Sequence, residues 1–318
     1  MESATKFSWT KEQLQQAVQQ ATKQDMTEAQ ELSDGWANSA YIIRLKNGQQ
    51  VVLKSAPADE THLMGYEKTD MLRTEVEALR LFSRSGTVPV PQVIADDNSK
   101  SIVSTHYYIM EFLEGAPYNK IKENLATEER DTINRKLGEI SRQINDVQND
   151  RFGFFWDTVS TDWQSTFTRM IDSVLADGAA AGISLPTDYT RITAEIRARL
   201  DALQEVKTPC LVHWDLWDGN AFVHEGRITG IIDFERAFWG DPLMEFYFGR
   251  MGRSEEFLDG YGKTALTENE RIRRGLYDLY LDLILRIECH YRAYTNQGHI
   301  NWTEENLQYG WNQFLSIR

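Results

Sequence analysis

Hydrophobic and polar residues follow two different periods along this chain of 318 residues. In the first third, short runs alternate between the two classes, which is the period of β-strands. Residues 41–45 and 50–54 form the clearest pair, and Asn47-Gly48 between them favours a type I′ hairpin turn. Further strands are predicted near 92–95, after a proline-rich break, and at 107–113. The first third is therefore expected to be rich in β-structure.

Most of the remaining chain has the period of an α-helix. Hydrophobic residues recur there at spacings of three and four, as Ile133, Leu137 and Ile140 do. Helices are predicted over 10–23, 70–83, 127–148, 162–177 and 187–205, and further stretches of apolar periodicity follow at 243–251, 268–294 and 303–316. We therefore predict an α+β fold with a β-rich N-terminal lobe (residues 1–114) and a larger, mainly helical C-terminal lobe (residues 115–318).

One segment of the second part carries a set of oxygen-bearing side chains. Asp215, Asn220 and Asp233 follow one another at spacings of five and thirteen, and residues 221–232 form a predicted hairpin that turns at 225–227. Such a hairpin would return Asp233 to the end that Asn220 leaves. Asp and Asn are common turn residues, but the two linked spacings favour a site for phosphoryl transfer. In such a site one carboxylate orients the attacking hydroxyl, while an amide and a second carboxylate hold magnesium.

The same residues carry a resemblance. His213-Trp-Asp215 with Asn220, followed by Ile232-Asp233 and later by Gly240-Asp-Pro242, is similar to the signature of aminoglycoside phosphotransferases and choline-kinase-like enzymes. The resemblance implies a protein-kinase-like fold, with ATP or GTP as co-substrate and Mg²⁺ as cofactor. It also implies that Asp215 is the catalytic base and that Asn220 and Asp233 are metal ligands. His213 is expected to be a buried scaffold residue.

In the N-terminal lobe, the resemblance implies a nucleotide site. A kinase lysine at the end of the third strand contacts phosphates and pairs with a glutamate of the next helix, which gives Lys54 and Glu75 here, with Glu77 as the alternative. The polar segment 32–40 would lie over the phosphates. The remaining nucleotide-binding residues implied are Gly35 and Asn38 in that segment and Met110, Phe112 and Leu113 at the strand that leads to the second lobe.

Three departures separate the chain from protein kinases. Glu235 stands where the glycine of an Asp-Phe-Gly switch would be, and Trp214 replaces a common arginine. Too few residues separate Asp233 from Gly240-Asp-Pro242 for a long regulated peptide-binding segment, and no Ala-Pro-Glu stretch follows. A small-molecule acceptor is therefore favoured. Trp214 also stands where the resembling family usually has glycine, and Gly35 is the single glycine of a loop that often carries two.

The acceptor itself is left open. In the resembling family acidic residues hold ammonium groups, and the residues that would do so here are Asp218, Glu235, Asp278 and Asp282, with Trp217 nearest the catalytic segment. Acidic pairs on helices are more often simply solvated. Asp-Leu-Trp-x-Gly-Asn is also similar to fructosamine kinases, so the alternatives are a fructosamine-, choline- or homoserine-type metabolite kinase and a non-catalytic nucleotide-binding protein.

Composition narrows the partners. The net charge of −14 argues against a nucleic-acid binder, because phosphate backbones require basic surface, and it is compatible with a cationic substrate. No apolar run is long enough to span a bilayer, and the N-terminus lacks the apolar core of a signal peptide. Cys210 and Cys289 are isolated, so neither a zinc site nor a redox pair is predicted. The expected location is cytoplasmic, and no oligomeric state is predicted.

Overall fold

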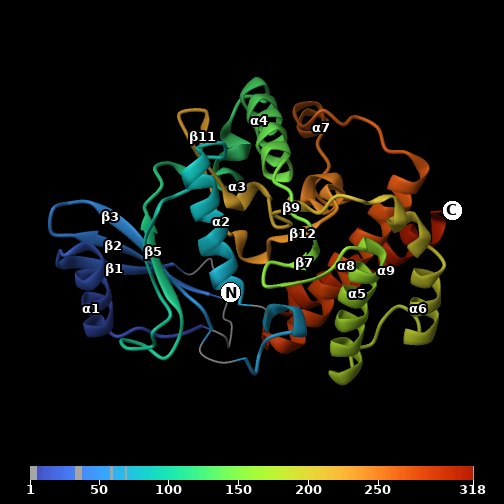
Figure 1. Cartoon of the computed structure of the whole chain (residues 1–318), viewed down its shortest axis with the longest axis horizontal. Coiled ribbons are helices and arrows are strands. Elements are labelled where there is room, and N and C mark those ends of the chain that lie inside the picture. Colours follow the sequence, from blue (N-terminus) through green and yellow to red (C-terminus); the bar gives the residue numbers. More distant parts are fainter. Residues whose placement is uncertain (1–5, 33–37, 58–59, 69, 318) are drawn as a thin grey trace.

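The computed structural model describes residues 6–32, 38–57, 60–68 and 70–317. Figure 1 shows a small lobe built on a β-sheet at the left and a larger helical lobe at the right, with helix α2 (Met71–Ser85) between them. This is the predicted two-lobed α+β arrangement. The polar segment predicted to cover the phosphates lies largely outside the described residues, and Gly35 with it.

The small lobe is an antiparallel five-stranded sheet in the order β1-β2-β3-β5-β4. Its strands are β1 (Met26–Leu32), β2 (Ser39–Leu45), β3 (Gln50–Ser55), β4 (Val93–Asp97) and β5 (Tyr107–Glu111), and helix α1 (Lys11–Thr22) begins at the predicted capping box of Thr10 and Gln13.

Alternation along β3 places its side chains on opposite faces of the sheet. Val51 and Leu53 are buried in a cluster that includes residues of α1. Lys54 points to the other face, where its ammonium group reaches Glu75 of α2. The strand period therefore delivers this lysine to the side of the sheet that faces the second lobe.

The turn between β2 and β3 differs from the prediction. Gly48 has a φ of +89°, but Asn47 is not among the residues with positive φ, and the amide of Gly48 donates to the carbonyl of Leu45. A type I′ turn needs positive φ at both central residues, so Asn47-Gly48 does not form one. The chain instead turns over Lys46 and Asn47, and the glycine follows in the left-handed region, as in a hairpin with a one-residue bulge.

The large lobe combines seven helices of the described chain with two small sheets. The helices are α3 (Tyr118–Ile121), α4 (Thr127–Asn145), α5 (Trp163–Ala180), α6 (Tyr189–Arg197), α7 (Glu255–Tyr261), α8 (Glu268–Tyr291) and α9 (Gln297–Ser316). The sheets are β11-β10-β6 and β8-β7-β12-β9, formed by β6 (Ala116–Pro117), β7 (Phe152–Phe154), β8 (Asp157–Ser160), β9 (Cys210–Val212), β10 (Ala221–His224), β11 (Arg227–Ile231) and β12 (Phe238–Gly240).

Two predicted helical stretches are shorter or absent. The helix predicted over 187–205 ends as α6 at Arg197, and a 3₁₀ segment (Leu200–Glu205) follows. Over 243–251 the structure has only short 3₁₀ turns, because the backbone of Glu245 is extended, with ψ of 143°. That geometry lets the Glu245 carboxylate accept hydrogen bonds from the catalytic segment instead of leaving it on a helix surface.

One hydrophobic core crosses the boundary between the lobes. Side chains of α2, such as Val76 and Phe82, belong to the same buried cluster as Leu137 of α4 and Phe234 beyond β11. The hydrophobic core is therefore continuous between the lobes, and the domain boundary at 114–115 stays a prediction. None of the described helices combines the length and the apolar composition that crossing a membrane requires.

Candidate active site

The segment between β9 and β10 is folded back on itself by its own hydrogen bonds. The amide group of Asn220 donates through Nδ2 to the backbone carbonyl of Asp215 at 2.8 Å. The backbone amide of Asn220 donates to the carbonyl of Trp217. Asn220 is buried, and this use of Nδ2 leaves Oδ1 as the atom of its amide that a metal ion could bind.

The predicted hairpin brings the second carboxylate back to this segment. Glu225 and Gly226 both have positive φ, 48° and 74°, so the type I′ turn occurs here. At the open end, the amide of Ile232 donates to the carbonyl of Asn220 at 3.0 Å. Asp233, the next residue, thus lies beside the segment that carries Asp215.

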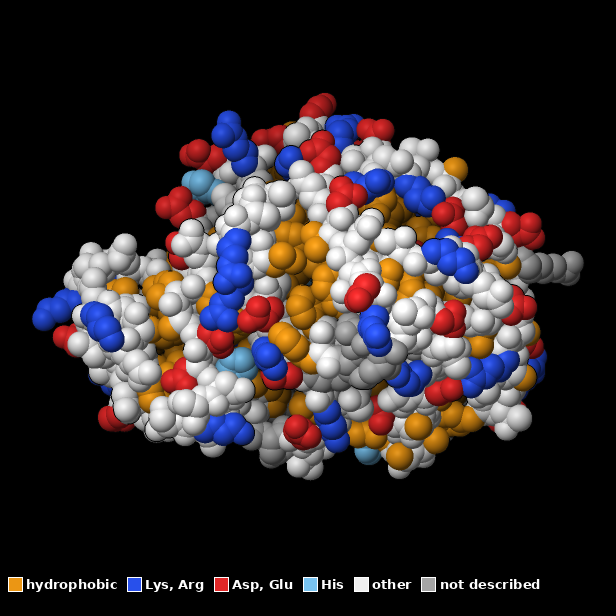
Figure 2. Space-filling model, in the orientation of Figure 1, with side chains coloured by type: hydrophobic (Ala, Val, Ile, Leu, Met, Phe, Trp, Pro, Cys, Tyr) orange, Lys and Arg blue, Asp and Glu red, His pale blue; other side chains and the backbone are white. Residues whose placement is uncertain are grey.

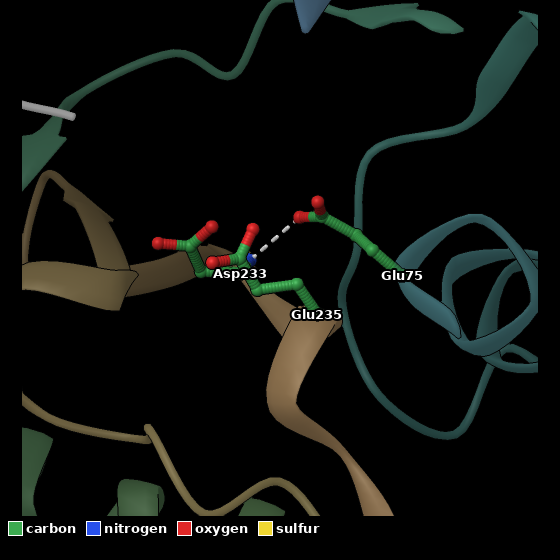
Figure 3. A group of neighbouring side chains, drawn as sticks. All are labelled: Glu75, Asp233 and Glu235. Carbon is green, nitrogen blue, oxygen red and sulfur yellow. Dashed lines mark hydrogen bonds between the residues drawn. The ribbon is translucent and has the colours of Figure 1, made fainter. Parts of the chain in front are cut away.

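Lys54 lies at the centre of three carboxylates. Its Nζ is 2.7 Å from Oε2 of Glu75 and 3.2 Å from Oε2 of Glu235, and it also contacts Asp233 directly. The other oxygen of Glu75 accepts from the backbone amide of Asp233 at 3.1 Å. Figure 3 shows Glu75 reaching from α2 toward the backbone of Asp233. Residues from β3, α2 and the end of the hairpin therefore converge at one point.

The charges of this group do not balance. Burial alone would lower the pKa of Lys54, but Asp233, Glu235 and Glu75 together raise it well above its ordinary value. Burial raises the pKa of Glu75, against the effect of the lysine, whereas for Asp233 the lysine outweighs burial and lowers the pKa. Three carboxylates around one ammonium group leave an excess of negative charge that a cation would relieve.

The donor set suits magnesium. Carboxylate oxygens of Glu75, Asp233 and Glu235 can lie within 4.8 Å of one another, and the Asn220 amide is joined to the same site through the hairpin. Mg²⁺ prefers carboxylate and amide oxygens and takes few protein ligands. The residues predicted to bind the metal, Asn220 and Asp233, therefore fit a Mg²⁺ ion chemically.

Glu235 lies beside Lys54, the residue predicted to bind the nucleotide. Its carboxylate pairs with Lys54 and also accepts a hydrogen bond from Asn38, the residue directly before β2. Its contact with the acceptor stays a prediction. In the structure the 3₁₀ turn after Asp233 (Phe234–Arg236) carries its carboxylate to the lysine. Asn38, which belongs to the segment predicted to cover the phosphates, is buried against this same group.

Asp215 is partly buried, and its environment favours the protonated form. Burial raises the pKa of its carboxyl to about 7, with Arg236 acting in the opposite direction and Asp233 and Glu235 reinforcing burial. A pKa near neutrality suits a group that must accept a proton. Sequence reasoning missed Arg236. Its position three residues after Asp233 was the one available signal.

A second residue missed from the sequence is Glu245. Its two oxygens accept from the backbone amides of His213 and Trp214 at 2.9 and 3.0 Å, and Asn145 of α4 also donates to it. The carboxylate is fully buried, and burial raises its pKa to about 7. Glu245 thus fixes the backbone directly before Asp215. An acidic residue within the apolar run 243–248 was its only sequence signal.

The neighbours of Asp215 explain two features of the sequence. His213 is buried, its ring lies at a tilt against that of Phe234, and its Nε2 contacts the carbonyl of Ile232, which agrees with a scaffold role. Trp214 has a φ of +66°, a region that glycine adopts without strain. Its ring stacks on Tyr280 at 5.5 Å, so packing offsets the strain that glycine would avoid.

The residues predicted to contact the purine take different positions. Met110 belongs to the buried core, and the side chain of Leu113 lies over Gly230 of β11, where a Cβ would come within 2.4 Å of it. Phe112 lies between them and is partly buried. The chain after β5 is therefore held against the β10–β11 hairpin, and base contacts from these three residues remain a proposal.

The acidic residues predicted to hold a cationic acceptor already have partners. Asp218 accepts from Lys122 at 2.7 Å and from the hydroxyl of Tyr247. Trp217, next to it, keeps 37% of its surface exposed and is the predicted acceptor residue that remains accessible.

The pair on α8 is also satisfied within the protein. Asp282 is fully buried and receives two hydrogen bonds from Arg250, at 2.8 and 2.9 Å. Asp278 accepts from Arg274 at 2.6 Å. Both carboxylates thus neutralise arginines within the protein, and their role toward the acceptor stays a prediction.

Solved structures with the same fold cover nearly the whole chain. The aminoglycoside phosphotransferase APH(2″)-IIa, in a ternary complex with streptomycin and ATP, matches with a TM-score of 0.63 and 18% identity over 98% of both chains. A protein of Thermobifida fusca YX-ER1 described as a fructosamine-3-kinase matches with a TM-score of 0.66 and 20% identity, over 94% of this chain and 98% of that one. At these identities the matches establish the fold.

Curated relatives share parts of the sequence. The probable ketoamine kinase of Vibrio cholerae is 27% identical over 219 residues, which are 65% of this chain and 70% of the relative. The probable acyl-CoA dehydrogenase IBR3 of Arabidopsis thaliana is 23% identical over 249 residues, 74% of this chain but 30% of the relative. A subtelomeric hrmA-associated cluster protein of Aspergillus fumigatus is 27% identical over 150 residues, 45% and 28% of the two chains. The match thus spans less than a third of the length of these last two relatives.

A family model matches most of the chain. The model of the phosphotransferase enzyme family matches residues 28–276, which include every residue of the lysine–carboxylate group and the whole catalytic segment. With the two-lobed kinase-like fold and the converging carboxylates, this match identifies the chain as a member of the phosphotransferase enzyme family.

Proposed function

We propose that the protein transfers the γ-phosphoryl group of ATP or GTP to a hydroxyl group of a small molecule. The observation that supports this most directly is the convergence of Lys54, Glu75 and Asp233 beside the segment of Asp215 and Asn220. Phosphoryl transfer depends mainly on positioning and on the neutralisation of charge, and these five residues offer both.

The proposed roles follow from the contacts. Lys54, held by Glu75, binds the phosphates of the nucleotide. Asn220 and Asp233 hold Mg²⁺, which would supply the positive charge that offsets the phosphates. Glu235 belongs to this side of the site, since it shares Lys54 with Asp233.

Asp215 acts on the acceptor. Its carboxylate accepts a hydrogen bond from the attacking hydroxyl, orients that oxygen toward the γ-phosphorus and takes the proton late in the reaction. Glu245 and Asn220 hold the backbone on either side of Asp215, so the carboxylate is oriented before the substrate arrives. Orientation of this kind accounts for a large part of the rate that such a group contributes.

Two acceptor classes have support. The solved aminoglycoside phosphotransferases share the fold, and the net charge of −14 suits a cationic acceptor. A sugar amine of the fructosamine type is the second candidate, supported by Asp-Leu-Trp-x-Gly-Asn in the catalytic segment and by the identity with the Vibrio cholerae ketoamine kinase. The second class needs fewer acidic contacts, and the predicted acidic residues on α8 are already paired with arginines.

The experiment is a coupled ADP- and GDP-release assay with ATP and GTP in turn. The acceptor panel contains aminoglycosides, macrolides, choline, homoserine and fructosamines. Asp215→Ala is the blank, and Asp150→Ala, which removes an exposed carboxylate, is the matched control. We expect release that depends on the acceptor and on Mg²⁺ in the wild type and the control, and none in the blank.

The alternative of a non-catalytic nucleotide-binding protein gives a different result. Such a protein would bind nucleotide without acceptor-dependent release, and Asp215→Ala would equal the wild type throughout. An acceptor that raises release equally in the wild type and in Asp215→Ala would contradict the proposed role of Asp215.

A further inference from the structure

A short segment of the small lobe crosses to the large lobe. Residues 60–68, which belong to the connection from β3 to α2, lie against α5 and the end of α8. We name them the crossing segment. The amide of Gly65 donates to Asp177 of α5 at 2.8 Å, and His62 contacts the carbonyl of Tyr291 at 3.0 Å. The connection between Lys54 and Glu75 is therefore anchored on the other lobe.

The crossing segment inserts a charge into the large lobe. Glu67 is 4% exposed, and its two oxygens accept from Arg292 and from the amide of Met64 at 2.9 Å. Arg292, at the end of α8, is also fully enclosed, and its Nη2 lies 3.6 Å from Glu288. A buried ion pair thus joins the two lobes behind the catalytic segment.

This pair continues to the active site. Glu288 lies 3.3 Å from Nη2 of Arg236, whose guanidinium group stands 5.7 Å from the ring of Trp214. The charge of Arg236 acts on the carboxyl of Asp215. Arg236, Glu288, Arg292 and Glu67 therefore form a chain of alternating charges between Trp214, the residue before Asp215, and the crossing segment.

Ring contacts follow the same path. Tyr66 of the crossing segment lies 6.1 Å from the ring of Trp214 and 5.8 Å from the guanidinium carbon of Arg236, and it stacks on Phe154 of β7. The segment consequently bounds the space in which the Arg236 side chain can move. Charge and shape both couple its position to that of Arg236.

We propose that Glu67 and Arg292 are positioning residues for phosphoryl transfer. Through Glu288 they hold Arg236 against the ring of Trp214, the residue directly before Asp215, so that turnover depends on the docking of the crossing segment onto α8. This inference rests on the proposed function. The connection between β3 and α2 links Lys54 to Glu75. The inference gives it a second role, which is to position groups near Asp215.

The physical reason lies in the burial of the chain. Each inner charge has a neighbour of opposite sign on either side, so removing one member leaves another without compensation in a poorly hydrated place. The contact between Arg236 and Glu288 would then change, and the guanidinium group of Arg236 would shift. A shift of about 1 Å in a group beside the reacting atoms is enough to cost roughly a hundredfold in rate.

The test measures kcat and both KM values for Glu67→Gln, Arg292→Met and Arg292→Lys at a temperature where all are folded. We expect kcat to fall about tenfold in the first two, with both KM values within about twofold of the wild type, and Arg292→Lys to recover part of the loss. The matched control is Arg250→Met, which breaks another ion pair of α8 without a described contact to Arg236.

A double-variant cycle separates positioning from loss of stability. If Glu67 acts through Arg236, Glu67→Gln combined with Arg236→Met should lose no more kcat than Arg236→Met alone. Unchanged kcat in folded Glu67→Gln, additive losses in the double variant, or an equal loss in Arg250→Met would each overturn the proposal.

A readout without turnover keeps this proposal separate from the proposed function. The Nε–Hε resonance of Arg236, identified by its disappearance in Arg236→Lys, is followed by NMR in Glu67→Gln. We expect it to shift, and to stay in place in Arg250→Met. If the wild type phosphorylates no acceptor, the proposed function fails, while an unmoved Arg236 resonance would refute the coupling itself.

Discussion

Two groups of acidic residues in this protein have different surroundings in the structure. Around Lys54, three carboxylates share one ammonium group. On α8, Asp278 and Asp282 face Arg274 and Arg250, one arginine for each carboxylate. The sequence suggested a binding role for both groups.

The ratio of charges separates the two groups. A balanced pair satisfies its hydrogen bonds within the protein, and each arginine offsets part of the desolvation of its carboxylate. An excess of carboxylates raises the energy of the folded chain unless a cation joins them. The first group is therefore where a metal ion and phosphates are expected, and the second is expected to hold α8 against the loop that carries Arg250. Figure 2 shows basic and acidic side chains interspersed over the face that it presents.

The largest expected effect is the loss of a ligand at the unbalanced group. Asp233→Asn should lower kcat by at least about a hundredfold, because the metal and phosphates lose their alignment with Asp215. Without Mg²⁺ the variant should be as stable as the wild type, since one like charge is removed from the group. Steady-state kinetics and thermal unfolding with and without Mg²⁺ measure both. A variant that unfolds early without Mg²⁺ would mean that Asp233 is structural.

At the balanced group the effect should be on stability. Arg250→Met leaves the buried Asp282 carboxylate without its cationic partner and should cost about 3 kcal/mol in the free energy of unfolding near neutral pH. Urea unfolding measures the change. At a temperature where the variant is folded, kcat should stay within about twofold of the wild type. A selective loss of acceptor binding would return this pair to the substrate site.

The pH dependence of stability sharpens the contrast. Burial raises the pKa of Asp282 to about 6, with Arg250 opposing the shift, so the folded state binds this proton more tightly than the unfolded chain. The stability that this group contributes is complete below about pH 4 and is lost as the pH rises through 6. Relative to Asp282→Asn, the wild type should lose up to about 3 kcal/mol between pH 4 and pH 7. Urea unfolding at both pH values tests this, and a constant difference would contradict it.

The smallest effect is expected at Asp218, which has one cationic partner and one hydroxyl partner. Asp218→Asn removes a partly exposed ion pair with Lys122 and should change the free energy of unfolding by about 1 kcal/mol or less. The KM for an uncharged acceptor should hardly change. Lys122→Met is the companion variant. A large rise in KM restricted to cationic acceptors would show that Asp218 binds the acceptor after all.

Local sequence patterns predicted a large part of the fold and of the site. The strand period placed Lys54 on the face opposite Val51 and Leu53. The hairpin that follows Asn220 returned Asp233 to the segment of Asn220. These features depend on neighbours in the chain, because the period of a strand and the length of a hairpin are local quantities. The exact turn at Asn47-Gly48 was wrong, since that loop uses positive φ at one residue only.

The contacts that distinguish one charged residue from another were not available locally. Glu245 and Arg236 are ordinary charged residues in the sequence, and their roles depend on His213, Trp214 and Glu288, which come from other parts of the chain. The same holds for Asp282, whose partner Arg250 precedes α8. Long-range packing sets these partners, and a sequence pattern carries no record of it.

The sequence by itself thus determined the class of chemistry, because the types and spacing of Asp215, Asn220 and Asp233 specify donors that phosphoryl transfer requires. The tertiary structure alone decided which of the remaining acidic side chains are free to meet a cation. The physical reason is that the behaviour of a buried carboxylate depends on the charges that surround it in space, and folding brings those charges together from distant parts of the chain.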